Sequence, residues 1–191
     1  QSAHLPGPYT AEAMAADLNP TLDALGVATA HVLGHSHGGA AAQVFARQHP
    51  ERVRSLLLVS TYTRQRLTWW ERVIGKLAPP AVMLLGTRRL AWGVQRLRPA
   101  GGGRKLSPQA AALRAATLAV NDTRQLAAAL RAAGSFDSRD WLATLQVPTL
   151  VITGAQDLVV VPHQARLLAA GIPGASLRVI DDGGHELTLS H

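Results

Sequence analysis

The sequence has no cysteine, and this absence excludes several kinds of chemistry. Without a thiol the chain has no disulfide, no cysteine-ligated metal site and no catalytic cysteine. It also lacks any apolar run of the ~18 to 20 residues that a membrane-spanning helix requires. No signal peptide is visible, so a cytoplasmic protein without a transmembrane segment is expected. The length of 191 residues is enough for one domain with a sizeable core, or for a domain with a small insertion.

Acidic residues are scarce in one segment of the chain. Residues 61–106 contain ten basic residues and one acid, Glu71, a net charge of +9, so the rest of the chain carries −2 of the total of +7. Two interpretations stay open: a solvated basic face on an arginine-rich protein, or a tryptophan-bearing surface that meets an anionic or lipid-like partner. No recognised nucleic-acid-binding motif accompanies the charge, so nucleic acid is not an expected partner.

The most informative stretch is a Gly-x-Ser-x-Gly pattern at residues 34–38, which follows a short apolar run and precedes an alanine-rich segment. This pattern is typical of a nucleophile elbow, in which a strand turns sharply into a helix with a serine at the bend. The serine backbone in such an elbow is strained, so that its hydroxyl stands clear of the sheet. Side chains at Gly34 and Gly38 would collide across so tight a turn. The sequence predicts that Ser36 occupies the bend.

The flanking patterns predict an α/β fold interrupted by helices. Thr10 is expected to cap a first helix, which Asn19-Pro20 interrupts and Gly26 ends. Predicted strands are 27–33, 53–60, 149–153 and 176–180, and the predicted helices of the core are 38–48 and 162–170. Residues 61–146 differ in composition, and helices are expected there at 66–77, 81–97 and 108–133, the last capped by Ser107. We therefore expect an α/β core from residues 1–60 and 147–191, with a helical insertion at 61–146.

Two loops after Ser36 carry the groups that a serine nucleophile needs. A serine hydroxyl requires a base within hydrogen-bond reach, and the base requires an acid that fixes its tautomer. Asp157 follows the predicted strand 149–153, and His185 follows the predicted strand 176–180. Functional loops of open α/β sheets gather at the carboxyl ends of the strands. The sequence thus predicts Ser36 as nucleophile, His185 as base and Asp157 as acid, with Asp181 and Asp182 as rivals for the acid.

The chain resembles the α/β-hydrolase fold family of esterases, lipases and lactonases, in which these groups follow in the order Ser, Asp, His. The matching segments are 32–39, 49–53, 147–157 and 179–185, and residues 172–183 are similar to polyhydroxyalkanoate depolymerase-like members. The resemblance implies a mostly parallel sheet with a helical cap at 61–146. It further implies a serine hydrolase that cleaves a small-molecule or lipid-like carboxylic ester through an acyl-enzyme, with no cofactor and no metal. The backbone N–H of His37 would be one oxyanion donor.

The resemblance also indicates a departure from the family. Its members usually begin with several more strands, and a His-Gly loop after one of them supplies the second oxyanion donor. This sequence opens after that region, so a fragment or a truncated product is expected, with the strand 27–33 at an unpaired edge. A rival hypothesis is a non-catalytic remnant that acts as a binding or interaction module. A third keeps the fold but changes the chemistry to acyl transfer, C–C bond hydrolysis or perhydrolysis.

The remaining candidates flank these motifs. His35 is expected to be a packing or substrate-binding residue beside the nucleophile. Trp69 and Trp70 are candidates to line an acyl pocket, or else belong to the core of the helical insertion. A metal cluster of His31, His35 and His37 is disfavoured, because the strand and the elbow would splay the three rings apart. Glu186 is expected to be a solvated neighbour of the base.

Overall fold

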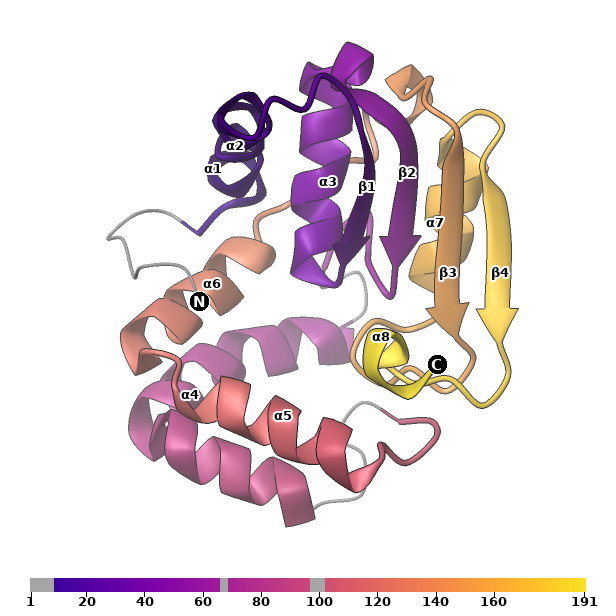
Figure 1. Ribbon diagram of the computed structural model, residues 1–191. Coiled ribbons are helices and arrows are strands. Elements are labelled where there is room, and N and C mark those ends of the chain that lie inside the picture. Colours follow the sequence, from indigo (N-terminus) through magenta and orange to yellow (C-terminus); the bar gives the residue numbers. More distant parts are fainter. Residues whose placement is uncertain (1–8, 66–68, 97–101) are drawn as a thin grey trace.

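A computed structural model describes residues 9–65, 69–96 and 102–191 of the chain. Four strands form one parallel sheet in the spatial order β1-β2-β3-β4. Their bounds are β1 (Ala30–His35), β2 (Val53–Val59), β3 (Thr149–Gly154) and β4 (Ser176–Ile180). The four strands point the same way in Figure 1, so their carboxyl ends lie at one edge of the sheet.

Helices pack against the sheet in the way that parallel crossovers require. Helix α3 (His37–Gln48) connects β1 to β2 and contacts both, and α7 (His163–Gly171) does the same for β3 and β4. Helix α1 (Ala11–Ala16) packs against α3, and α2 (Leu18–Ala24) follows it. The short elements are η1 (Pro50–Arg52), η2 (Leu142–Thr144) and α8 (Leu187–Ser190).

The core lies between the sheet and the helices α3 and α7. Leu56, Leu58 and Val151 of the sheet meet Phe45 of α3 and Leu168 of α7, and all five side chains are buried. These apolar contacts fix the strand register, because a shift by one residue would turn Leu56 and Leu58 away from the helices.

The opposite face of the sheet has less cover from the described residues. Leu33 of β1, whose side chain lies on that face, is 56% exposed. Leu33 pairs with Leu57 of β2, and Leu57 pairs with Leu150 of β3. Both of these leucines are half-buried. Strand β1 also stands at an edge of the sheet that the described residues form. This edge position agrees with the expectation for the first predicted strand.

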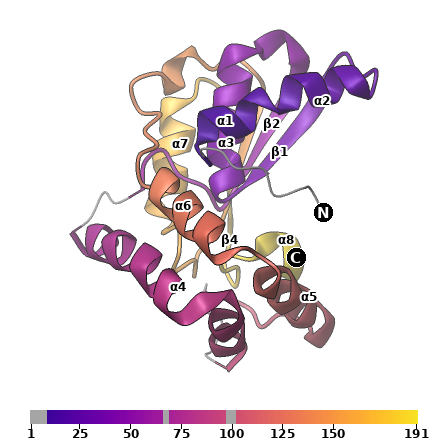
Figure 2. The same cartoon turned by 90° about the vertical axis from the view of Figure 1, so that its left-hand side faces the viewer.

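Between β2 and β3 the chain forms the helices α4 (Trp69–Arg96), α5 (Pro108–Ala119) and α6 (Thr123–Ala133). Figures 1 and 2 show these helices beyond the carboxyl ends of the strands, separate from the helices that cover the sheet. None of the helices in the described ranges is long and apolar enough to cross a bilayer.

The predicted helix boundaries in this insertion need correction. Two helices are predicted at 66–77 and 81–97, and α4 also consists of two helices, but the kink between them lies at Gly86. The first of them continues through Pro79 and Pro80, where the sequence predicted the break. Glycine reaches the φ of +73° at the kink without strain. The predicted helix 108–133 is two helices, because the Asp122 side chain accepts from Gln125 N–H and starts α6. Ser107 caps α5 as predicted. Residues 66–68 and 97 lie outside the described residues.

Boundaries before the elbow also shift. Thr10 caps α1 as predicted, through its bond from Ala13 N–H at 3.2 Å. The break that was expected at Asn19 lies at Asp17 instead, and Pro20 falls in the first turn of α2, where its missing N–H costs no helical bond. Strand β1 begins later than predicted and continues through His35, directly before the elbow.

Candidate active site

Ser36 lies at the turn between β1 and α3. Its backbone has φ +53° and ψ −124°, a conformation that is strained for a residue with a side chain. Two bonds hold the turn in place: Ser36 N–H donates to the Val59 carbonyl at 3.0 Å, and Thr61 Oγ1 donates to the Ser36 carbonyl at 2.7 Å. The end of β2 and the residue pair that follows it therefore support the strained peptide.

The close packing at this turn involves Gly34 and Gly39. A Cβ atom on Gly34 would lie 2.5 Å from the Cα of Gly39, and one on Gly39 would collide with the side chain of Thr61. The prediction for Gly34 is therefore confirmed. The prediction for Gly38 is wrong, because a Cβ there would meet no atom within 4 Å. The crossing of β1 and α3 occurs one residue later than the sequence pattern indicated.

His185 lies between Ser36 and Asp157. Its Nε2 is 3.0 Å from Ser36 Oγ, and its Nδ1 is 3.0 Å from Asp157 Oδ2. A carboxylate accepts hydrogen bonds only, so Nδ1 carries the proton in that contact and Nε2 of the neutral ring is an acceptor. The His185 ring thus connects Ser36 and Asp157, so that the three residues predicted from three separate segments form one chain of contacts.

Asp157 is held by more than the histidine. Its side chain has no exposed surface, and its Oδ1 accepts the backbone N–H groups of Val159 and Val160, both at 2.8 Å. These bonds offset the cost of burying a carboxylate and fix which oxygen faces His185. The rival Asp182 points elsewhere: its Oδ1 is 3.1 Å from His191 Nε2, and this hydrogen bond lowers the pKa of Asp182.

The two histidines beside the nucleophile have different partners. His35 Nε2 is 2.7 Å from the backbone carbonyl of His185, so it donates, and the two rings have centroids 5.0 Å apart. The His37 ring lies between the Tyr9 carbonyl, 3.0 Å from Nε2, and the Tyr62 hydroxyl, 2.8 Å from Nδ1. Because a carbonyl only accepts, Nε2 carries the proton and Nδ1 accepts from Tyr62. Burial raises the pKa of Tyr62, which keeps its hydroxyl a donor.

The remaining sequence candidates differ in their exposure and in their partners. Trp69, at the start of α4, is 76% exposed, and the side chain of Trp70 lies outside the described residues. Glu186 is not the solvated neighbour that the sequence suggested, because its carboxylate is 3.0 Å from Arg114 Nε and its side chain is 24% exposed. His31 pairs with Ser55 Oγ at 2.7 Å, away from the two histidines of the elbow.

An open hollow of about 740 Å³ lies on the helical insertion. Its lining comes from α4 and from Arg131 of α6, and includes Lys76, Pro80 and Met83. None of the three residues at the Ser36 contact lines it. This hollow is therefore separate from the site at the carboxyl ends of the strands.

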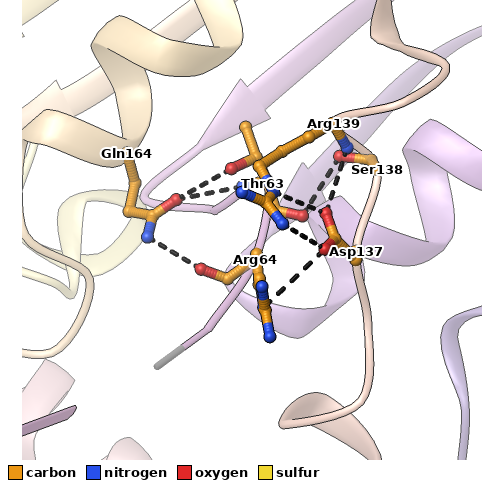
Figure 3. A network of polar contacts seen from close by, with 6 residues as sticks. All are labelled: Thr63, Arg64, Asp137, Ser138, Arg139 and Gln164. Atoms are coloured by element: carbon orange, nitrogen blue, oxygen red, sulfur yellow. Dashed lines mark hydrogen bonds and ion pairs between the residues drawn. The ribbon is translucent and has the colours of Figure 1, made fainter. Parts of the chain in front are cut away.

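A buried polar junction near the site was not apparent from the sequence (Figure 3). Gln164 Oε1 accepts from both N–H and Oγ1 of Thr63 at 3.2 Å, and Gln164 Nε2 donates to the Arg64 carbonyl at 2.8 Å. Ser138 Oγ donates to Gln43 Oε1 at 2.8 Å and also contacts the Thr63 carbonyl. The junction joins the segment that leaves the sheet after β2 to the one that returns before β3.

The exposed side of the junction carries charge. Arg64 and Asp137 form an antiparallel bridge, and the Asp137 carboxylate lies 2.8 Å from Arg139 and 3.7 Å from Arg64. The hydrogen bond from Arg139 holds the pKa of Asp137 below its ordinary value. No sequence spacing links residues about 70 to 100 positions apart, so only the fold reveals this junction.

The whole chain, residues 1–191, matches the family described as alpha/beta hydrolase fold. The chain belongs to this family. It is 32% identical over 190 residues to a poly(3-hydroxyalkanoate) depolymerase of Ectopseudomonas oleovorans, an alignment that covers 92% of this chain and 62% of the depolymerase.

Two solved structures show the same likeness. A hydrolase from Pseudomonas aeruginosa PA01 is 29% identical with a TM-score of 0.83, covering 97% of this chain and 69% of the other. The enol-lactonase from Burkholderia xenovorans LB400 is 27% identical with a TM-score of 0.79, covering 97% and 70%. The chain thus spans 62% of the depolymerase and somewhat more of the two solved chains.

Proposed function

We propose that this protein is a serine hydrolase that cleaves a carboxylic ester through an acyl-enzyme. The observation that carries the proposal is the continuous contact from Ser36 Oγ through the His185 ring to the buried Asp157 carboxylate. The names of two similar proteins, a poly(3-hydroxyalkanoate) depolymerase and an enol-lactonase, support an ester as the substrate. The proposed substrate is a small-molecule or lipid-like ester.

In the first step His185 acts as general base. Its Nε2 accepts the proton of the Ser36 hydroxyl as Oγ attacks the ester carbonyl, and the ring becomes a cation. Asp157 keeps Nδ1–H in place and stabilises this cation. The contacts from Val159 and Val160 hold the carboxylate in the orientation that serves His185.

The negative charge that develops on the carbonyl oxygen needs preorganised donors. His37 is the first residue of α3, and the N–H groups of the first helical turn have no acceptor within the helix. The positive end of the helix dipole is at the same place. We assign the His37 N–H as one oxyanion donor, a contact whose removal costs on the order of 10² to 10³ in rate in related sites.

The second half of the reaction reverses the proton transfer. His185 gives its proton to the leaving alcohol, the acyl group stays on Ser36 Oγ, and His185 then accepts a proton from a water that attacks the acyl-enzyme. The acid product leaves and the hydroxyl is restored. The helices α4 to α6 are proposed to act as a cap over this site, since they lie beyond the carboxyl ends of the strands (Figure 1).

A labelling experiment tests the proposal. The purified protein is treated with a fluorophosphonate, and hydrolysis of a p-nitrophenyl ester is followed in parallel. Labelling is expected in the wild type and is expected to disappear in Ser36→Ala and His185→Ala.

The chain offers a matched control for these variants. Ser55 and His31 are also a serine and a histidine 2.7 Å apart on the same sheet, but no carboxylate contact to His31 is recorded in the described residues. Ser55→Ala and His31→Ala are therefore expected to label like the wild type. Absence of labelling in a wild-type protein that circular dichroism shows to be folded would contradict the proposal and favour a binding module instead.

A further inference from the structure

The glycine-rich segment before α5 contacts the two loops that carry Asp157 and His185. Gly102 and Gly103 have φ values of +73° and +76°, which residues with side chains rarely adopt. A Cβ atom on Gly102 would collide with the Gln156 carbonyl oxygen, and one on Gly103 would collide with the backbone of Gly184. Main chain therefore packs on main chain, next to Asp157 on one side and next to His185 on the other.

Two polar contacts extend this packing. The N–H of Arg104 donates to the Asp182 carbonyl at 2.7 Å, which ties the segment to the histidine loop. From α5, Arg114 Nε lies 3.0 Å from Glu186 Oε1, and Glu186 directly follows His185 in the chain. Both side chains of this ion pair are less than a quarter exposed, so solvent screens it less than a surface pair.

The two loops also pack on each other. A Cβ atom on Gly154 would collide with the backbone of Gly183, and Gln156 N–H donates to the Gly183 carbonyl at 2.9 Å. Gly102 and Gly103 thus pack against two loops that are themselves joined by backbone contacts. Any displacement of the segment reaches both loops together.

We propose that Gly102, Gly103 and Arg114 form a clamp by which the helical insertion positions Asp157 and His185 against Ser36. The proposal rests on the proposed function of His185. These are positioning residues, because they touch the loops rather than the reacting atoms. The insertion then sets the geometry of proton transfer as well as access to the site, and the Ser36–His185 contact of 3.0 Å depends on its docking.

The glycine test uses a pair of positions with the same backbone cost. Gly102→Ala places a side chain at φ +73° against Gln156, whereas Gly174→Ala places one at φ +71° with no atom within 4 Å. We expect Gly102→Ala to slow fluorophosphonate labelling of Ser36 by about tenfold or more, since a misplacement of about 1 Å can cost on the order of 100-fold. Gly174→Ala is expected to label at the wild-type rate.

The ion-pair test follows the same logic. Arg114→Ala is expected to lower kcat for ester hydrolysis with little change in KM, and Arg114→Lys is expected to restore part of the loss. Arg114→Ala and Glu186→Ala combined are expected to lose little more than either alone, because the two side chains act as one contact. Asp23→Ala removes an ion pair with Arg52 at 2.8 Å, away from the loops of Asp157 and His185, and serves as the control, with kcat unchanged.

The outcomes separate this proposal from the proposed function. If the wild type labels and Gly102→Ala and Arg114→Ala label at the same rate as it does, the clamp is overturned and the hydrolase proposal stands. If the folded wild type does not label, the hydrolase proposal fails, and imidazole NMR decides the clamp. In that case the His185 ring signals must shift in Gly102→Ala but not in Gly174→Ala, and unchanged signals would overturn the clamp as well.

Discussion

Replacing Asp157 by asparagine isolates the electrostatic part of the Asp157–His185 contact. Asp157 Oδ1 accepts two backbone N–H groups, and Oδ2 faces His185 Nδ1. In Asp157→Asn the amide oxygen must take the place of Oδ1, because an NH₂ group there would oppose two donors. The amide NH₂ then faces His185 Nδ1, which can only accept from it. The histidine is therefore forced into the tautomer that carries its proton on Nε2.

This tautomer cannot accept the proton of Ser36. The expected loss in kcat is on the order of 10⁴, the size that a wrong histidine tautomer produces in serine proteases. Folding should change little, because each of the three donor–acceptor contacts keeps a partner. Asp157→Ala differs in this respect: it leaves the buried N–H of Val160 and the partly buried N–H of Val159 without their acceptor, at about 1–3 kcal/mol for the buried group.

The assay combines hydrolysis rates, urea unfolding and imidazole ¹⁵N NMR of His185, above the pH range in which histidine titrates. Asp157→Asn is expected to be nearly inactive and almost as stable as wild type, with His185 protonated on Nε2. Asp157→Ala is expected to be inactive and clearly less stable. An Asp157→Asn variant that keeps more than about 1% of wild-type activity would refute the tautomer argument, since the tautomer effect alone exceeds that. A ring protonated on Nδ1 in this variant would refute it equally.

Three further predictions concern stability. Gly39→Ala should lower the free energy of unfolding in urea by about 1–3 kcal/mol because of overpacking. Gly38→Ala has open space around the new methyl group and should be neutral or raise the free energy of unfolding by up to about 1 kcal/mol. Equal effects would contradict the assigned crossing point of β1 and α3. Gln164→Ala should cost about 2 kcal/mol or more by removing the acceptor of the buried N–H and hydroxyl of Thr63, and a cost below about 0.5 kcal/mol would contradict the junction. Because its contact with Arg139 lowers the pKa of Asp137, this carboxylate stabilises the fold above its ordinary pKa and loses that effect as pH falls through the lowered value. The stability difference between wild type and Asp137→Asn should therefore shrink on acidification, and a difference that grows would reverse the assigned sign.

The features that could be predicted from the sequence are those with a local cause. The elbow is encoded within a few residues around Ser36, and the loops of Asp157 and His185 follow directly from strands whose apolar runs are readable. Parallel strands then bring their carboxyl ends together without further information. Ser107 and Thr10 could likewise be named as caps, because a cap acts within three residues of itself.

Features that depend on distant partners could not be predicted. Glu186 looked solvated because its partner, Arg114, lies in a different helix with no pattern that connects the two. The helix predicted at 108–133 looked continuous because most of its residues favour helix, and the Asp122 cap competes with them only at one point. Gly38 and Gly39 are adjacent in sequence, and only the contacts of Gly39 with Gly34 and Thr61 in the fold distinguish them.

The two attachments of the helical insertion differ in what they touch. The polar junction at Thr63, Ser138 and Gln164 is bonded to main chain and to buried side chains, and none of its recorded bonds involves Ser36, Asp157 or His185. The glycine segment packs directly on the loops beside Asp157 and His185. A substitution at the junction should therefore change stability, or KM through the placement of the helices, before it changes kcat. A substitution at the glycine segment should do the reverse, because its first effect falls on the contact between base and nucleophile.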